Sequence, residues 1–105
     1  MANPDAPRVL VLAACTVDLH AGRVQRGAEA ELLTHREREV LRYLAARPEQ
    51  DVSLEALHRE VFGFHARAET RAAYHTVRRL RQKIEKDPAN AELLVTETGG
   101  YKLVP

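Results

Sequence analysis

The sequence feature that most constrains the fold is a basic amphipathic segment at residues 69–86, ETRAAYHTVRRLRQKIEK. Its apolar side chains recur at intervals of four, three and four, which places them on one face of an α-helix. They are Ala73, Val77, Leu80 and Ile84. The remaining positions are rich in cations, namely Arg71, Arg78, Arg79, Arg81, Lys83 and Lys86. The pattern predicts a helix with a narrow buried stripe, whose basic side fits either a solvated face or a negative partner.

The positive charge of the chain is concentrated in this segment. Residues 65–86 carry seven basic and two acidic side chains, whereas the residues before and after each carry a net charge of −2. One positive patch on a near-neutral body is typical of a protein that binds a polyanion. A membrane surface would also attract this patch, but the apolar stripe lacks the Trp or Phe anchors of a membrane-inserting helix. We therefore expect no membrane partner, and the N-terminus has no signal-peptide pattern.

Composition and residue types exclude several other classes. A chain of 105 residues is long enough for one domain with a core of its own. The single cysteine, Cys15, cannot form an internal disulfide, which fits a reducing compartment and a small buried side chain. The five histidines form no known metal-ligand spacing, so no metal or cofactor is expected. No phosphate-cradling glycine loop or nucleophile–base set is present, so the sequence does not indicate an enzyme.

The first part of the chain predicts a small sheet followed by a helix. After a flexible tail at residues 1–7, short strands are expected at residues 8–12, 16–19, 23–25 and 28–33. Thr34 and Glu37 form a capping-box pattern that begins the helix, and Pro48 ends it. A capping role for Glu37 is favoured over a catalytic one.

A second helix is expected from Ser53 to Gly63, with a stripe of Leu54, Leu57 and Val61 and with Phe62 just after it. The basic helix at about 70–86 follows, and then two strands at 93–97 and 101–104, joined by a turn at 98–100. The predicted fold class is α+β: a winged helix-turn-helix with an N-terminal four-stranded antiparallel sheet, three helices and a C-terminal β-hairpin wing. Such a domain, residues 8–105, would place the basic helix in a DNA major groove and the wing, about 93–104, on the backbone.

Residues 8–104 resemble a known family in the order and spacing of these features. The matching stretches are LLTHREREVLRYLAARPEQDVSLEALHREVFG, VRRLRQKIEKDP and VTETGGYKL. They resemble the DNA-binding effector domain of OmpR/PhoB-type response regulators. The resemblance implies sequence-specific binding of double-stranded DNA in bacterial transcription control, by a cytoplasmic, nucleoid-associated protein.

The resemblance also implies roles for individual residues. It directs His75 and Arg79 toward base edges, Arg71 and Thr76 toward phosphates, and Arg78 toward either. Tyr101 matches the wing tyrosine that meets the DNA backbone. A loop that carries Gly63, Phe64, His65 and Arg67 resembles the segment that contacts RNA polymerase in activators. Relatives bind direct repeats, which implies a tandem dimer on DNA.

Three departures from the family pattern bear on function. The wing has Glu97 and Thr98 where many relatives carry an arginine, so a strong minor-groove contact is not implied. Tyr74 and His75 stand where an acidic and an aliphatic residue are frequent, so the family's base preference is not carried over. The sequence contains no phosphoacceptor receiver domain. The acidic wing leaves open an alternative function, a winged-helix protein–protein interaction module that has lost DNA binding.

Overall fold

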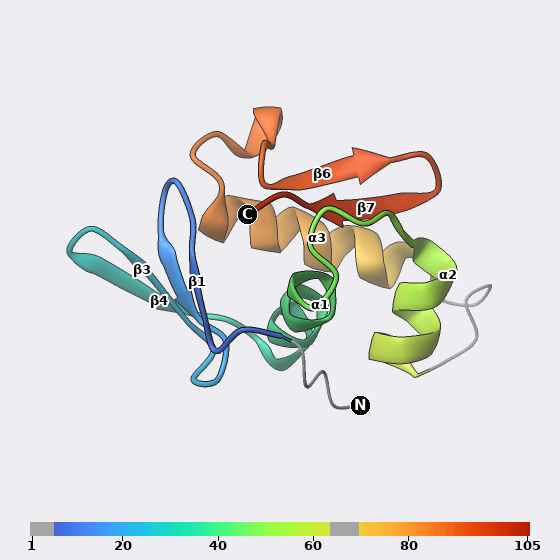
Figure 1. Ribbon diagram of the computed structural model, residues 1–105, viewed down its shortest axis with the longest axis horizontal. Coiled ribbons are helices and arrows are strands. Elements are labelled where there is room, and N and C mark those ends of the chain that lie inside the picture. Colours follow the sequence, from blue (N-terminus) through green and yellow to red (C-terminus); the bar gives the residue numbers. More distant parts are fainter. Residues whose placement is uncertain (1–5, 64–69) are drawn as a thin grey trace.

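The computed structural model describes residues 6–63 and 70–105, and its elements run from a sheet through helices to a hairpin (Figure 1). In chain order they are β1 (Val9–Val11), β2 (Thr16–Asp18), β3 (Arg23–Arg26), β4 (Glu29–Leu32), α1 (His35–Ala45), β5 (Val52–Ser53), α2 (Leu54–Leu57), η1 (His58–Phe62), α3 (Thr70–Ile84), η2 (Pro88–Asn90), β6 (Leu94–Glu97) and β7 (Gly100–Leu103). The first sheet and α2 lie at opposite ends of the long axis, and the β6–β7 hairpin runs beside α3 (Figure 1). This arrangement confirms the predicted fold class.

The first four strands form one antiparallel sheet in the order β1-β2-β3-β4, as predicted. Val17 of β2 pairs with Leu10 of β1 on one side and with Val24 of β3 on the other, and all three side chains are buried. Because side chains alternate along a strand, Val9 and Val11 point to the opposite face and are exposed. The sheet therefore covers the core with one face only.

The capping box predicted for α1 is confirmed. The Thr34 hydroxyl accepts a hydrogen bond from the Glu37 amide at 3.1 Å, and the Glu37 carboxylate accepts one from the Thr34 amide at 2.9 Å. These two bonds satisfy backbone donors that the first helical turn leaves without partners. The helix ends at Ala45, three residues before Pro48.

The second helix has the predicted ends but a different interior. The Ser53 side chain caps it, and Gly63 ends it in a left-handed conformation with φ of 70°. Its second half, η1, is a π-helix, whose turn holds one residue more than an α-helical turn. Leu57 and Phe62, five residues apart, are therefore both buried, whereas Leu54 and Val61 are only partly buried. The predicted stripe of Leu54, Leu57 and Val61 does face the core, and the π-helical turn brings Phe62 into the core beside it.

The hairpin is part of a three-stranded sheet in the order β5-β7-β6, and β5 was not predicted. Glu97 pairs with Gly100, so the turn consists of Thr98 and Gly99 alone, with φ of 76° at Gly99. Ser53 lies opposite Gly100, and a Cβ at Gly100 would collide with the Val52 carbonyl oxygen. Only glycine lets β5 approach the wing this closely.

The basic helix ends at Ile84, two residues earlier than predicted. The Arg26 guanidinium of β3 donates hydrogen bonds of 3.0 Å to the carbonyl oxygens of Lys83 and Glu85. The buried Glu85 carboxylate accepts hydrogen bonds from the backbone amides of the segment that leads into β6, including that of Leu94 at 2.7 Å. Arg26, distant in sequence, thus fixes the end of α3, and Glu85 fixes the start of the wing.

Candidate nucleic-acid interface

The rotation of α3 about its axis is fixed by its apolar stripe. Ala73, Val77, Leu80 and Ile84 are all buried, as the spacing predicts. Residues at the same three- and four-residue spacing on the opposite side are all exposed; they are Arg71, His75, Arg78 and Gln82. We call these four residues the α3 outer row. Three of them were predicted as DNA contacts, whereas Gln82 was missed because an uncharged residue adds nothing to a charge pattern.

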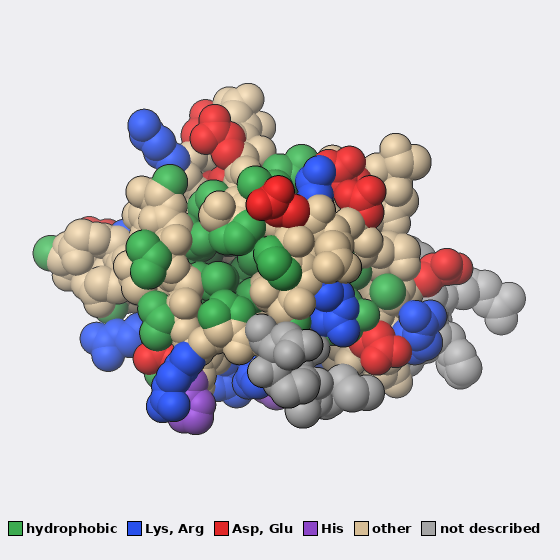
Figure 2. Space-filling view, viewed as in Figure 1, with side chains coloured by type: hydrophobic (Ala, Val, Ile, Leu, Met, Phe, Trp, Pro, Cys, Tyr) green, Lys and Arg blue, Asp and Glu red, His purple; other side chains and the backbone are tan. Residues whose placement is uncertain are grey.

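Basic side chains are not gathered in this way on the face drawn in Figure 2. Within the described part of the chain, Lys and Arg there are scattered, with Asp and Glu among them, around a central group of hydrophobic side chains (Figure 2). Of the six cations that the sequence analysis associated with a solvated face or a negative partner, Arg71 and Arg78 lie in the α3 outer row.

Arg79 lies on the flank of α3 toward α1, and an acidic residue contacts it there. Its Nε is 3.3 Å from Oε2 of Glu37, which is fully buried, while the Arg79 side chain is 52% exposed. Lys83 Nζ lies 2.6 Å from the other oxygen of the same carboxylate. Burial would raise the pKa of Glu37, but hydrogen bonds from Lys83, the Thr34 amide and Arg79 together hold this pKa below its ordinary value.

Thr76 does not lie on the exposed side of α3. It falls within the arc of the helix that faces the core, between Ala73 and Leu80, and it is 2% exposed. This burial contradicts the predicted phosphate contact of its side chain. The position was assigned from the family resemblance alone, and a helix whose stripe includes residues 73, 77 and 80 turns residue 76 inward.

Tyr101 is likewise withdrawn from the surface. The residue is 7% exposed, and the Arg81 guanidinium lies 5.7 Å from the centre of its ring. Burial raises the pKa of the Tyr101 phenol, although the nearby Arg81 charge opposes this rise. A buried phenol that packs between wing and helix does not match the predicted backbone contact.

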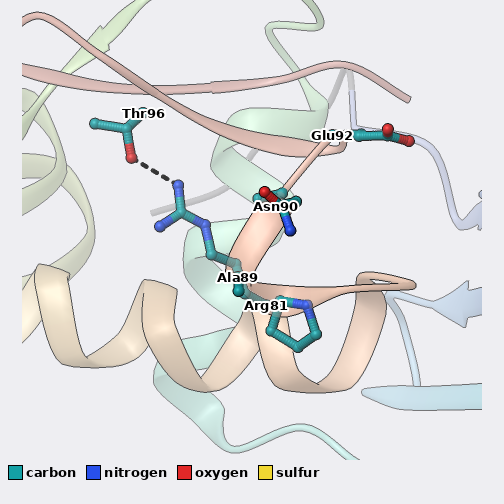
Figure 3. Close-up of a pocket in the computed structure, with 7 residues that line it drawn as sticks. Arg81, Ala89, Asn90, Glu92 and Thr96 are labelled. Atoms are coloured by element: carbon teal, nitrogen blue, oxygen red, sulfur yellow. Dashed lines mark hydrogen bonds between the residues drawn. The ribbon is translucent and has the colours of Figure 1, made fainter.

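The wing is attached to α3 through Arg81, which crosses from the helix to β6. Its Nε donates to the Leu94 carbonyl oxygen at 2.9 Å. Its Nη2 donates to Thr96 Oγ1 at 2.7 Å, the bond drawn in Figure 3. On the same hairpin, Glu97 is paired with Lys102 at 3.2 Å, so the wing's acidic group is partly neutralised. Arg81 therefore holds the hairpin against α3.

The predicted polymerase-contact loop falls largely outside the described residues. Gly63 is described and ends η1, whereas Phe64, His65 and Arg67 are not. Within residues 6–63 and 70–105, no three or more His, Cys, Asp or Glu side chains are grouped to hold a metal ion. No helix among these residues has the length and apolar character needed to span a bilayer.

Known proteins share both the sequence pattern and this geometry. Residues 28–103 match the family model described as "Transcriptional regulatory protein, C terminal". The chain is 38% identical over 105 residues to the DNA-binding response regulator MtrA of Mycobacterium tuberculosis, an alignment that covers 98% of this chain and 46% of MtrA. The chain thus spans about half the length of the curated relatives it matches.

Two solved structures share the fold. The Thermotoga maritima response regulator DrrB, an OmpR/PhoB homologue, superposes with a TM-score of 0.80 at 21% identity, over 93% of this chain and 45% of DrrB. The Klebsiella pneumoniae RstA DNA-binding domain, in complex with the RstA box, gives a TM-score of 0.76 at 21% identity, over 93% of this chain and 98% of that domain. These two likenesses show the shared fold, and the family match over residues 28–103 leads to one conclusion: the chain belongs to the family of transcriptional regulatory protein C-terminal domains.

Proposed function

We propose that this domain binds double-stranded DNA in a sequence-specific manner and thereby regulates bacterial transcription. The observation that carries the proposal is the α3 outer row, which presents Arg71, His75 and Arg78 opposite a fully buried stripe. A helix of this kind fits the width of the major groove, and its arginines match the negative phosphates and the acceptor pair of guanine. The related MtrA proteins are named DNA-binding response regulators.

We keep the roles that the family resemblance implies, for members of the row and for Arg79 on the flank beside it. His75 and Arg79 are assigned to base edges, Arg71 to phosphates, and Arg78 to either kind of contact. Gln82 joins the proposal because it is exposed in the same row, and its amide can pair with the N6 and N7 positions of adenine. Binding involves no covalent step, and the family is one of transcription regulators rather than enzymes.

Partners beyond DNA form a finer part of the proposal. We assign to residues 63–67 a contact with RNA polymerase, and to the domain a tandem dimer on repeated DNA sites. The outward face of the first sheet supports self-association, because Val9, Val11 and Leu32 are exposed there. The proposed place of action is the cytoplasm, at the nucleoid.

A comparison of matched charge-removal variants tests DNA binding. Fluorescence anisotropy with a labelled mixed-sequence duplex at low salt would compare the wild type with Arg71→Ala/Arg78→Ala and with Arg8→Ala/Arg23→Ala. The second pair removes the same charge from exposed positions at the first sheet. We expect the α3 pair to weaken binding by at least about tenfold and the sheet pair by much less. Absence of duplex binding by the folded wild type would favour the protein-interaction module instead.

A further inference from the structure

A buried carboxylate beneath α3 contacts one of the arginines assigned to base edges. Glu37 of α1 is fully buried, and its two oxygens have different partners. Oε1 accepts from Lys83 Nζ at 2.6 Å and from the Thr34 amide at 2.9 Å. Oε2 accepts from Arg79 Nε at 3.3 Å. The carboxylate is thus fixed from three directions before any ligand arrives.

The atom of Arg79 that Glu37 contacts determines what remains available. A guanidinium carries five N–H donors, and the bond to Glu37 uses the one on Nε. The two terminal nitrogens, Nη1 and Nη2, together form the parallel fork that fits O6 and N7 of guanine. The Arg79 side chain is 52% exposed, and its bond to Glu37 through Nε leaves Nη1 and Nη2 for a ligand.

We propose that Glu37 is a positioning residue for DNA reading, which holds the Arg79 fork in the orientation that a guanine in the major groove accepts. This inference rests on the proposed function. An unrestrained arginine loses much rotamer freedom when it binds, and a carboxylate that already holds Nε reduces this loss. The role is separate from the Thr34 cap, since the cap uses Oε1 and Arg79 uses Oε2.

A double-mutant cycle tests this role on the site that the wild type selects from random duplexes. Each guanine of that site is replaced in turn by 7-deazaguanine, which lacks the N7 acceptor. The quantity compared is the ratio of affinities for the guanine and the 7-deazaguanine duplex. We expect this ratio to be about tenfold or more at one guanine for the wild type, and to fall to one for Arg79→Ala. Glu37→Gln keeps the side-chain length and a capping acceptor, and it should reduce the ratio to within about threefold. In the Arg79→Ala background, Glu37→Gln should have no further effect on this ratio.

Lys83→Gln is the matched control, because it removes the other cation from the same carboxylate. It should leave the 7-deazaguanine ratio at the wild-type value even where thermal stability falls. Full discrimination by folded Glu37→Gln, or an equal loss in Lys83→Gln, would overturn the inference. DNA binding that weakens steeply with salt, but whose 7-deazaguanine ratio is the same in the wild type and in Arg79→Ala, would also overturn the inference. That result would leave the proposed function in place. Failure of the wild type to bind any duplex would overturn both.

A measurement on the wild type alone covers the case in which Glu37→Gln does not fold. Nuclear magnetic resonance relaxation reports the order of each arginine Nε–H bond in the free domain. We expect the Arg79 Nε–H to be markedly more ordered than that of exposed Arg78. Equal mobility of the two would overturn the inference.

Discussion

At the scale of single residues, Glu37 connects the start of α1 to two cations of α3 that lie far away in sequence. It completes the cap of α1 with Thr34, pairs with Lys83 and contacts Arg79 of α3. The capping pattern is local, and so the sequence predicted it. The pairs with Arg79 and Lys83 span 42 and 46 residues, and no spacing rule reaches that far.

The depressed pKa of Glu37 predicts a specific loss of stability in acid. Because the folded state binds this proton less readily than the unfolded state, the stabilisation is complete above the ordinary pKa of 4.5 and is lost as pH falls through the folded value. We expect Glu37→Gln to flatten the pH dependence of the free energy of unfolding between about pH 5 and about pH 3. Urea denaturation at each pH measures this.

The Asp18 pKa is also lowered, by hydrogen bonds from the Ala21 and His20 amides. The Glu37→Gln variant therefore retains some acid sensitivity from Asp18. Asp18 is present in both proteins, and the difference between the two curves isolates Glu37. Parallel curves of unfolding free energy against pH for the wild type and the variant would show that protonation of Glu37 does not affect stability.

Gly99 and Gly100, adjacent in the wing, should respond very differently to alanine. At Gly99 the φ of 76° disfavours a side chain but the space is open, so we expect Gly99→Ala to cost about 1–2 kcal/mol. At Gly100 the new Cβ would collide with the Val52 carbonyl and lie 2.8 Å from Ser53 Cα, so we expect at least about 3 kcal/mol. Chemical denaturation compares the two, and equal costs would mean that β5 can move away from β7 without loss.

At the scale of elements, the wing depends on α3 through Arg81. Arg81→Met keeps most of the aliphatic side chain but removes the hydrogen bonds to Leu94 and Thr96. We expect a loss of about 1–3 kcal/mol, with amide protection falling in β6 more than in α1. Hydrogen exchange with residue resolution measures this. A uniform decrease across both elements would indicate that Arg81 stabilises the whole domain and not the wing in particular.

The elements show where sequence reasoning succeeded and where it did not. Caps, periodicity and turn residues are local signals, and they located α1, the first four strands, the hairpin and the stripe of α3. β5 has only two residues, and it exists because Gly100 admits Val52 beside Tyr101. The π-helical turn of η1 has no spacing signature, since Leu57 and Phe62 fit no α-helical interval. Both features depend on tertiary packing.

At the candidate site, too, local signals were read correctly and the effects of tertiary packing were missed. Charge and spacing identified Arg71 and Arg78, whose exposure the structure bears out. Resemblance assigned Thr76 and Tyr101 to DNA, but burial withdraws both side chains. Burial on α3 follows from the position of the stripe, and the stripe alone would have excluded Thr76. The burial of Tyr101 depends on how the wing packs, which the sequence does not reveal.

At the scale of the whole molecule, the near-zero net charge is the sum of one strongly positive segment and two weakly negative ones. The net charge of +5 over residues 65–86 contrasts with the +1 of the whole chain. α1 and α2 pack against α3, whose apolar stripe is buried in the shared core, and the opposite side of the helix exposes the α3 outer row. We therefore expect the electrostatic attraction for DNA to be concentrated on α3.

The salt dependence of DNA affinity tests this claim most directly. Binding of a mixed-sequence duplex would be titrated from low to moderate salt with the wild type and with Arg71→Ala/Arg78→Ala. At about −0.9 per neutralised phosphate, we predict a log–log slope steeper than about −2 for the wild type, and one shallower by up to about 2 for the variant. A flat wild-type slope, or an unchanged slope in a folded variant, would contradict the assignment of the α3 outer row to DNA.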